Sequence, residues 1–244
     1  MMNFKKFEHP FGSHQAWVIA LLLLSADLAF MTMHTVNALT VWWNNPMLNI
    51  EKDHGYPETF QYLKYFWASI LCVVLAVRGR AWQFLAWAFL FVYLLADDSL
   101  TLHEQAGSAV AAHLNFVPPW GLRTQDVGEL VSALGTAIVL CVPLALAYVK
   151  GSSRFRLASL HLAQLVLVLA SFGVLVDMLH MTVQSGWKLK FILAFVEDGG
   201  EMITASALLA YTYLLCMHEG DPPTHAPWNL LLPFRSTSTF AAAS

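Results

Sequence analysis

The sequence places three carboxylic acids inside an apolar stretch near its C-terminal end. Residues 188–217 are apolar enough to span a membrane, yet they include Glu197, Asp198 and Glu201. A carboxylate inside a bilayer costs about 2.5 to 3.5 kcal/mol even on the most lenient scale, so an acid in such a position indicates function. On a helix Glu197 and Glu201 share one face, where they can bind a proton, a metal ion or a partner helix.

Further acids and imidazoles lie at a comparable depth in the other apolar stretches. Counting about 1.5 Å per helical residue from the inner membrane face puts most of them roughly 24 to 36 Å along their helices, in the outer half. Convergence from several spans is more informative than any one residue. The residues concerned are Asp27, His34, Asp97, Asp98, His103, Glu104, Glu129, Asp177 and His180.

These side chains predict a site for a divalent transition metal, zinc or iron. Carboxylates with imidazoles suit zinc, iron or manganese better than copper(I), which prefers sulfur ligands. Asp177 and His180 have the spacing of one metal-binding pair of a di-iron bundle, but the second pair is missing, so mononuclear zinc fits equally well. The predicted metal ligands are His34, His103, Asp177, His180, Glu197 and Glu201, and the predicted catalytic residues are Glu201, Glu104 and Asp98.

Three functions are compatible with such a site, and the sequence leaves open whether the protein is an enzyme. The first is a metal-dependent membrane enzyme that carries out hydrolysis or redox chemistry on a lipid-soluble substrate. The second is a proton- or cation-coupled transporter, because Gly199 and Gly200 beside the acids could break the helix as at transport sites. Alternatively, these glycines only allow close helix approach.

The third function is a non-catalytic membrane subunit whose polar side chains merely join helices. This hypothesis explains the three acids of residues 188–217 poorly, because the sequence suggests no Lys or Arg at their depth. Protons or a bound cation must then neutralise them.

The composition is that of an integral membrane protein. Of 244 residues, 57% are hydrophobic and 12% charged, against about 25% charged in soluble domains. The basic residues are scattered instead of gathered on one face, so nucleic acid is not an expected partner. Each of the three cysteines falls in a different apolar segment, which favours neither a disulfide framework nor a Cys-type zinc site.

Six segments reach the length of about 20 residues that is needed to cross the hydrocarbon of a bilayer. We therefore predict an all-α, polytopic integral membrane protein, built as a six-transmembrane-helix bundle. The second segment has no acid or internal histidine and is predicted to lie at the periphery, facing lipid. The segments are 15–43, 60–77, 81–113, 126–149, 156–184 and 188–217.

The chain is predicted to form one membrane domain, residues 15–217, between a cytoplasmic segment, 1–14, and a loosely ordered tail, 218–244. Basic residues concentrate on the side of the two termini, so the positive-inside rule predicts a multi-pass inner-membrane protein with both termini in the cytoplasm. The expected partners are the lipid bilayer and a lipid-soluble small molecule. Assembly into an oligomer or a larger membrane complex is also compatible with the sequence.

Overall fold

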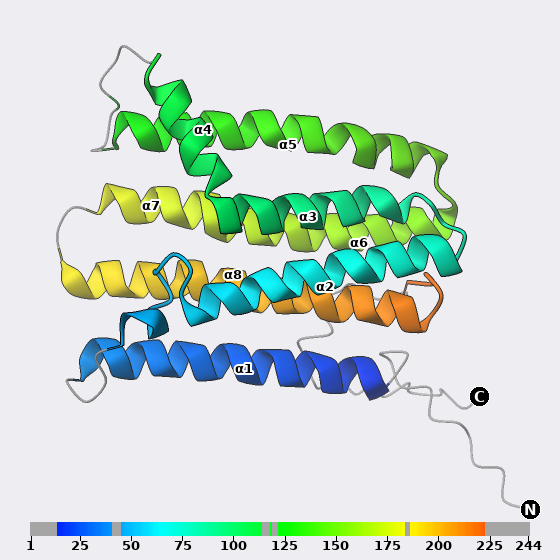
Figure 1. The fold of residues 1–244 in the computed structure, drawn as a ribbon, viewed down its shortest axis with the longest axis horizontal. Coiled ribbons are helices and arrows are strands. Elements are labelled where there is room, and N and C mark those ends of the chain that lie inside the picture. The colour runs from blue at the N-terminus through cyan, green and yellow to red at the C-terminus, as the bar shows by residue number, and fades with distance from the viewer. Residues whose placement is uncertain (1–13, 41–44, 114–117, 119–121, 184–185, 223–244) are drawn as a thin grey trace, which may run out of the picture.

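The computed structural model describes residues 14–40, 45–113, 118, 122–183 and 186–222. Within these residues the regular elements are all helical, and most run side by side along the long axis of the molecule (Figure 1). Five helices are long and apolar enough to cross a membrane, and one bent pair raises the number to six. The predicted all-α membrane bundle is confirmed.

The helices begin and end close to the predicted segments. They are α1 (His14–Leu39), the short 3-10 helix η1 (Pro46–Leu48), α2 (Tyr56–Arg78), α3 (Phe84–Leu100), α4 (Leu102–Ala111), α5 (Thr124–Lys150), α6 (Ser153–Ala170), the π-helix η2 (Ser171–Val176), α7 (Asp177–Thr182) and α8 (Trp187–Met217). The predicted cytoplasmic segment, apart from residue 14, and most of the predicted tail, residues 223–244, lie outside the described residues.

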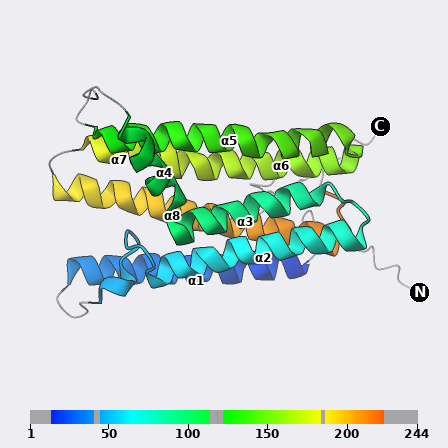
Figure 2. The ribbon, with the colours of Figure 1, turned by 45° about the horizontal axis from the view of Figure 1, so that its top comes forward.

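The third predicted segment is broken. The axes of α3 and α4 differ in direction by 71°, and the bend falls at Thr101, whose φ of 48° is left-handed. A β-branched residue rarely adopts this conformation. Beyond the bend α4 packs against α5 (Figure 2). The fifth predicted segment, in contrast, is one continuous span, Ser153–Thr182, with the π-helix η2 in its middle.

Helix α8 forms the centre of the bundle. Most of it is buried, and it packs against α1, α2 and α6. Helix α2 lies between α3 and α8 and buries the polar side chains of Gln61, Lys64 and Ser69. The prediction that the second segment lies at the periphery is therefore wrong, although one face of α2 stays exposed. Of the five long spans, α5 is the least buried.

Two glycines let α8 approach its neighbours closely. A Cβ atom at Gly199 would collide with Met31 of α1, and one at Gly200 would collide with Phe172 of η2. Helix α8 continues through both glycines without a break. Close helix approach, one of the two predicted roles of this pair, is confirmed. The predicted break is wrong.

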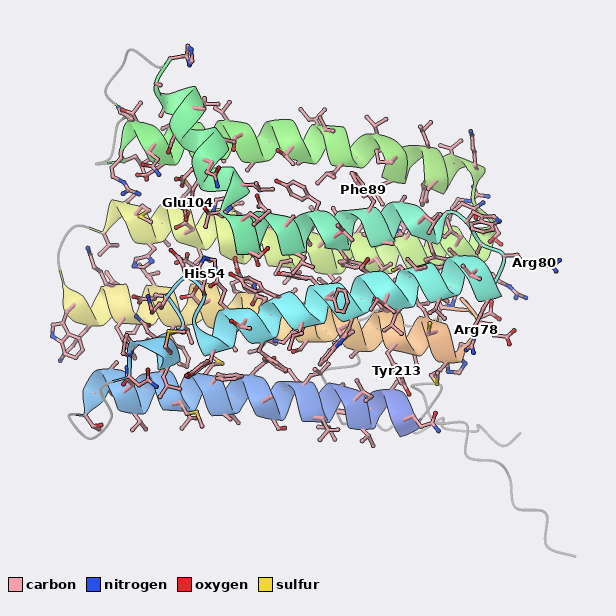
Figure 3. All side chains as sticks on the ribbon, viewed as in Figure 1. His54, Arg78, Arg80, Phe89, Glu104 and Tyr213 are labelled. Atoms are coloured by element: carbon pink, nitrogen blue, oxygen red, sulfur yellow. The ribbon has the colours of Figure 1, made fainter. Side chains whose placement is uncertain are left out.

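The two ends of the bundle differ in charge. The acid end, where α1 ends and α2 and α8 begin, contains Asp97, Asp98, His103, Asp177, His180, Glu197 and Glu201. The basic end, where α2 and α8 end, contains Arg78, Arg80, Lys150, Arg154 and Arg156. Figure 3 labels Arg78 and Arg80 at the basic end, and His54 and Glu104 towards the other.

Candidate functional site

Helices α7 and α8 bring three of the predicted ligands together. The Nδ1 atom of His180 lies 2.8 Å from Oε2 of Glu197. Asp177, one turn before His180 on α7, forms a side-chain hydrogen bond with the same glutamate. Two carboxyl groups can hydrogen-bond only if they share a proton. The side chains of His180 and Glu197 are still 21% and 16% exposed, so this trio is not sealed inside the bundle.

Glu201 lies one turn further along α8, where α2 and the π-helix η2 meet it. The Nε2 atom of Gln61 donates to Oε2 of Glu201 at 3.3 Å and to the Tyr65 hydroxyl at 3.2 Å. On the other side, Oε1 of Glu201 lies so close to Gly173 that a side chain there would collide with it. Short π-helical turns occur frequently at functional sites. The π-helix thus brings a backbone without a side chain against this carboxylate.

The break between α3 and α4 lies directly beside two acids. Asp97 Oδ1 accepts a hydrogen bond from the Tyr93 hydroxyl at 3.1 Å, and its Oδ2 is 3.3 Å from Nδ1 of His103, which lies beyond the break. Among neighbouring charges, that of Glu201 acts most strongly on Asp98. The predicted catalytic acid Asp98 is therefore within reach of the charge of Glu201, although the two come from different spans.

His34 lies apart from these contacts, although it was a predicted metal ligand. Its imidazole is buried and stacks on Phe191, with ring centroids 5.3 Å apart. The backbone N–H of Ile50 donates to Nδ1 of His34 at 3.4 Å, and no partner is found for its buried Nε2. An imidazole that accepts at Nδ1 carries its proton on Nε2. Held this way, His34 presents a donor instead of a metal-ligating lone pair.

Glu104, the third predicted catalytic residue, lies in the first turn of α4 beside His103, and its charge acts on that imidazole. Glu129 of α5 accepts a hydrogen bond from Gln125 at 2.8 Å. The backbone of Glu129 lies so close to Gly107 of α4 that a Cβ atom there would be 2.8 Å from the Glu129 Cα. Small residues at this crossing hold α4 against α5.

One buried charged residue, Lys64 of α2, was not among the predicted site residues. Its Nζ atom lies 2.5 Å from Oδ1 of Asp27 and donates to the carbonyl of Met202 at 2.9 Å. The hydroxyl of Ser206 donates to the other carboxylate oxygen of Asp27 at 2.5 Å. The expectation that no Lys or Arg lies at the depth of the α8 acids is therefore wrong, because Lys64 reaches the residue after Glu201, although its ion pair is with Asp27. The available signal was that Lys64 lies inside the second apolar segment.

Two cations near the acid end are paired with acids, whereas Lys188 and Lys190 in the first turn of α8 are exposed and form no ion pair among the described residues. Lys64 is taken by Asp27, and the Arg123 guanidinium, just before α5, lies 2.7 Å from Oδ1 of Asp126. Hydrogen bonding to Asp126 raises the pKa of Arg123 above its ordinary high value, so this guanidinium stays charged. Among the described residues, no Lys or Arg forms an ion pair with the other acids of this end, which include Asp98, Asp177, Glu197, Asp198 and Glu201.

The predicted ligands do not form a ready metal site. Within the described ranges, no group of three or more His, Cys, Asp or Glu side chains is placed to hold one ion. The ligand-type residues contact one another in two separate sets, Asp97 with His103 and Asp177 with Glu197 and His180. A zinc or iron ion stays a prediction.

Fold and site together define a helical membrane bundle with paired acids and imidazoles at one end. Residues 15–217 match a family model described as a domain of unknown function, DUF8692, and because this is most of the chain, the protein belongs to that family. Searches of curated proteins and of solved structures found no match.

Proposed function

We propose that the protein is a proton- or cation-coupled membrane transporter whose coupling site is centred on Asp98 and Glu201. The observation that carries the proposal is the break at Thr101, three residues after Asp98, in the third span. Transporters hold coupling ions where discontinuous helices expose carbonyl groups and helix ends beside buried acids. The α3–α4 pair supplies such a break in the third span.

The charge balance at the acid end supports the same proposal. Asp98, Asp177, Glu197 and Glu201 have no Lys or Arg partner among the described ion pairs. Buried acids without fixed cations must take up protons or a mobile cation. A site whose occupancy has to change in every cycle needs groups of this kind, whereas fixed ion pairs would keep one charge state.

Helix α2 provides neutral hydrogen-bond partners that can pair with Glu201 in both its ionised and its protonated form. The Gln61 amide donates to Glu201 and to Tyr65. An amide has both a donor and an acceptor end, so it can pair with a carboxylate or, after turning over, with a carboxylic acid. The same pocket can thus hold Glu201 in either form without leaving a buried group unpaired.

A divalent-metal enzyme acting on a lipid-soluble substrate is the second candidate. The contact of Asp177, Glu197 and His180 favours it, because these are ligand types for zinc and iron. A metal ion would replace the proton that the two carboxyl groups share. Such an ion could polarise a substrate for hydrolysis or support redox chemistry. Side chains would have to turn to complete the coordination shell.

We further propose that the acid end faces outward and that the termini lie in the cytoplasm of a cell with an inner membrane. The support is the grouping of Arg78, Arg80, Lys150, Arg154 and Arg156 at the opposite end of the spans. Short basic connections of this kind favour the cytoplasmic side.

The test uses purified protein in liposomes that contain a pH-sensitive dye. Pulses of Na⁺, K⁺, Mg²⁺, Mn²⁺ or Zn²⁺ are applied with and without an imposed membrane potential. We expect wild-type protein to change the internal pH in response to a cation or to the potential. Glu201→Gln and Asp98→Asn should abolish the change. Asp221→Asn is the matched control, because Asp221 forms an exposed pair with Arg154 at the basic end.

The proposal is rejected if wild-type protein moves no protons under any of these conditions, or if Glu201→Gln behaves like wild type. Elemental analysis of the same preparations decides the second candidate. One zinc or iron ion per chain, lost in the His180→Ala variant, would favour the metal enzyme over the transporter. If all variants change only stability, the acids form a structural network.

A further inference from the structure

A groove lies on the membrane face of the bundle, nearer the basic end than the acid end. Its volume is about 300 Å³, and its walls are α1 and α2, with α8 as the floor. Helices α1 and α2 each pack on α8 and touch one another little, which leaves α8 accessible between them. Figure 3 labels Tyr213 in this gap, towards the basic end. The lining includes Leu22, Leu23, Trp67, Ile70, Leu209 and Tyr213.

The groove is apolar and opens where the bilayer must be. All three helices are long and apolar enough to span a membrane, so hydrocarbon is the surrounding medium of the opening. The rim is exposed, with Leu22 at 60%, Trp67 at 41% and Ile70 at 44%, whereas Leu23 and Leu209 at the bottom are buried. A cavity of about half this volume, lined by similar residues, holds a benzene molecule. The groove therefore has room for a length of acyl chain.

A basic side chain lies at the end of the groove. On α2, Arg78 is seven residues beyond Leu71, which also lines the groove, and residues seven apart share one helix face. The rise of about 1.5 Å per residue puts Arg78 roughly 10 Å further along that face, at the membrane surface. Cys216 of α8 lies near both residues. Its thiol is 3.5 Å from the Leu71 carbonyl oxygen, and the charge of Arg78 acts on it.

We propose that this groove is a binding site for one anionic phospholipid. An acyl chain lies between α1 and α2 on α8, and the phosphate headgroup pairs with Arg78. Basic pockets beside transmembrane helices select anionic headgroups, while packing of the chain in a fitted groove distinguishes a bound lipid from the surrounding bilayer. The inference depends on the membrane fold alone and is independent of the proposed transport function.

The experiment is native mass spectrometry of the full chain, reconstituted in nanodiscs of phosphatidylglycerol, phosphatidylcholine or an equal mixture. We expect one phosphatidylglycerol to stay bound to wild-type protein after release from the nanodisc, in preference to phosphatidylcholine. Arg78→Gln should lower this retention about fivefold, the effect of one basic side chain at a membrane surface. Arg80→Gln is the control, because Arg80 lies at the same end but off the groove face of α2.

A second pair of variants tests the chain-binding part. Ile70→Trp fills the groove from its exposed rim and should remove the bound lipid without unfolding the protein. Val73→Trp, on the same helix, has the same 42% to 44% exposure but lies outside the groove lining, and should keep the lipid. Circular dichroism and size-exclusion profiles verify that all four variants are folded.

Three results would overturn the inference. Equal retention of both lipids by wild type and all variants would mean that only ordinary bilayer lipids surround the groove. Loss of lipid in the control variants as well as in the groove variants would mean that lipid binding does not depend on the groove residues. A dimer in place of a lipid adduct, disrupted by Ile70→Trp, would assign the groove to a second copy of the chain.

Discussion

Replacing Lys64 by Met tests the buried ion pair that joins α1, α2 and α8. The side chains of Lys64 and Asp27 are 0% and 1% exposed, and their charged atoms are 2.5 Å apart. Breaking a buried pair by removing one partner is destabilising by about 3 to 5 kcal/mol, because an uncompensated charge stays behind. Asp27 would keep only the hydrogen bond from Ser206.

Protonation of Asp27 sets an upper limit on the stability that Lys64→Met can cost. Asp27 can escape its charge by taking up a proton, which for an ordinary aspartate costs about 4 kcal/mol at pH 7. The loss in the free energy of unfolding should therefore be about 4 kcal/mol at pH 7. It should shrink to about 1.5 kcal/mol at pH 5, because a group that is neutral when folded and ionised when unfolded favours the folded state as the pH falls.

Reversible unfolding in mixed detergent–SDS micelles measures this loss at both pH values. Asp27→Asn combined with Lys64→Met should recover most of the stability and remove the pH dependence, since no charge is left in the pair. Lys188→Met, at an exposed position of α8, is the control and should change stability by less than about 0.5 kcal/mol. The reasoning fails if Lys64→Met matches this control, or if its cost is the same at pH 5 as at pH 7.

Three further outcomes are expected from single substitutions. Gly128→Ala should destabilise the protein by about 1 to 3 kcal/mol in the same unfolding assay, because its Cβ would meet the backbone of α4; Gly135→Ala, on the same helix with open space around it, should not. Thr101→Gly should be neutral or stabilising by up to about 1 kcal/mol, since glycine tolerates the left-handed φ. Gly173→Ala should reduce cation-driven pH changes in liposomes, because its methyl group would displace the Glu201 carboxylate.

The sequence was sufficient for the fold class and for the level of the acids. Both depend on local quantities, namely the length of an apolar run and the number of residues between a polar group and the end of its helix. Asp177 and His180, and Glu197 four residues before Glu201, therefore came out on shared faces, and the structure brings His180 and Glu197 into contact.

The break in the third span could not be predicted in this way. The sequence around Thr101 has no glycine or proline, the usual signals of a helix end. What accompanies the bend is packing of α4 on α5, where the glycines at positions 107 and 128 let the two backbones touch. Conversely, Gly199 and Gly200 suggested a break, but Met31 and Phe172 fill the space beside them and α8 stays intact. Both outcomes depend on residues distant in sequence.

The orientation of the charged residue Lys64 could not be predicted from the sequence for the same reason. The absence of an acid or an internal histidine from residues 60–77 suggested that α2 faces lipid, although this segment contains Gln61 and Lys64. Only contact with α1 and α8 decides that this polar face points inward, where Lys64 meets Asp27. That contact also uses up the one ammonium group that the described part of α2 buries. The acids around Glu201 gain no fixed cation from it, so a proton or a mobile cation must still balance them, although a lysine does lie at their depth.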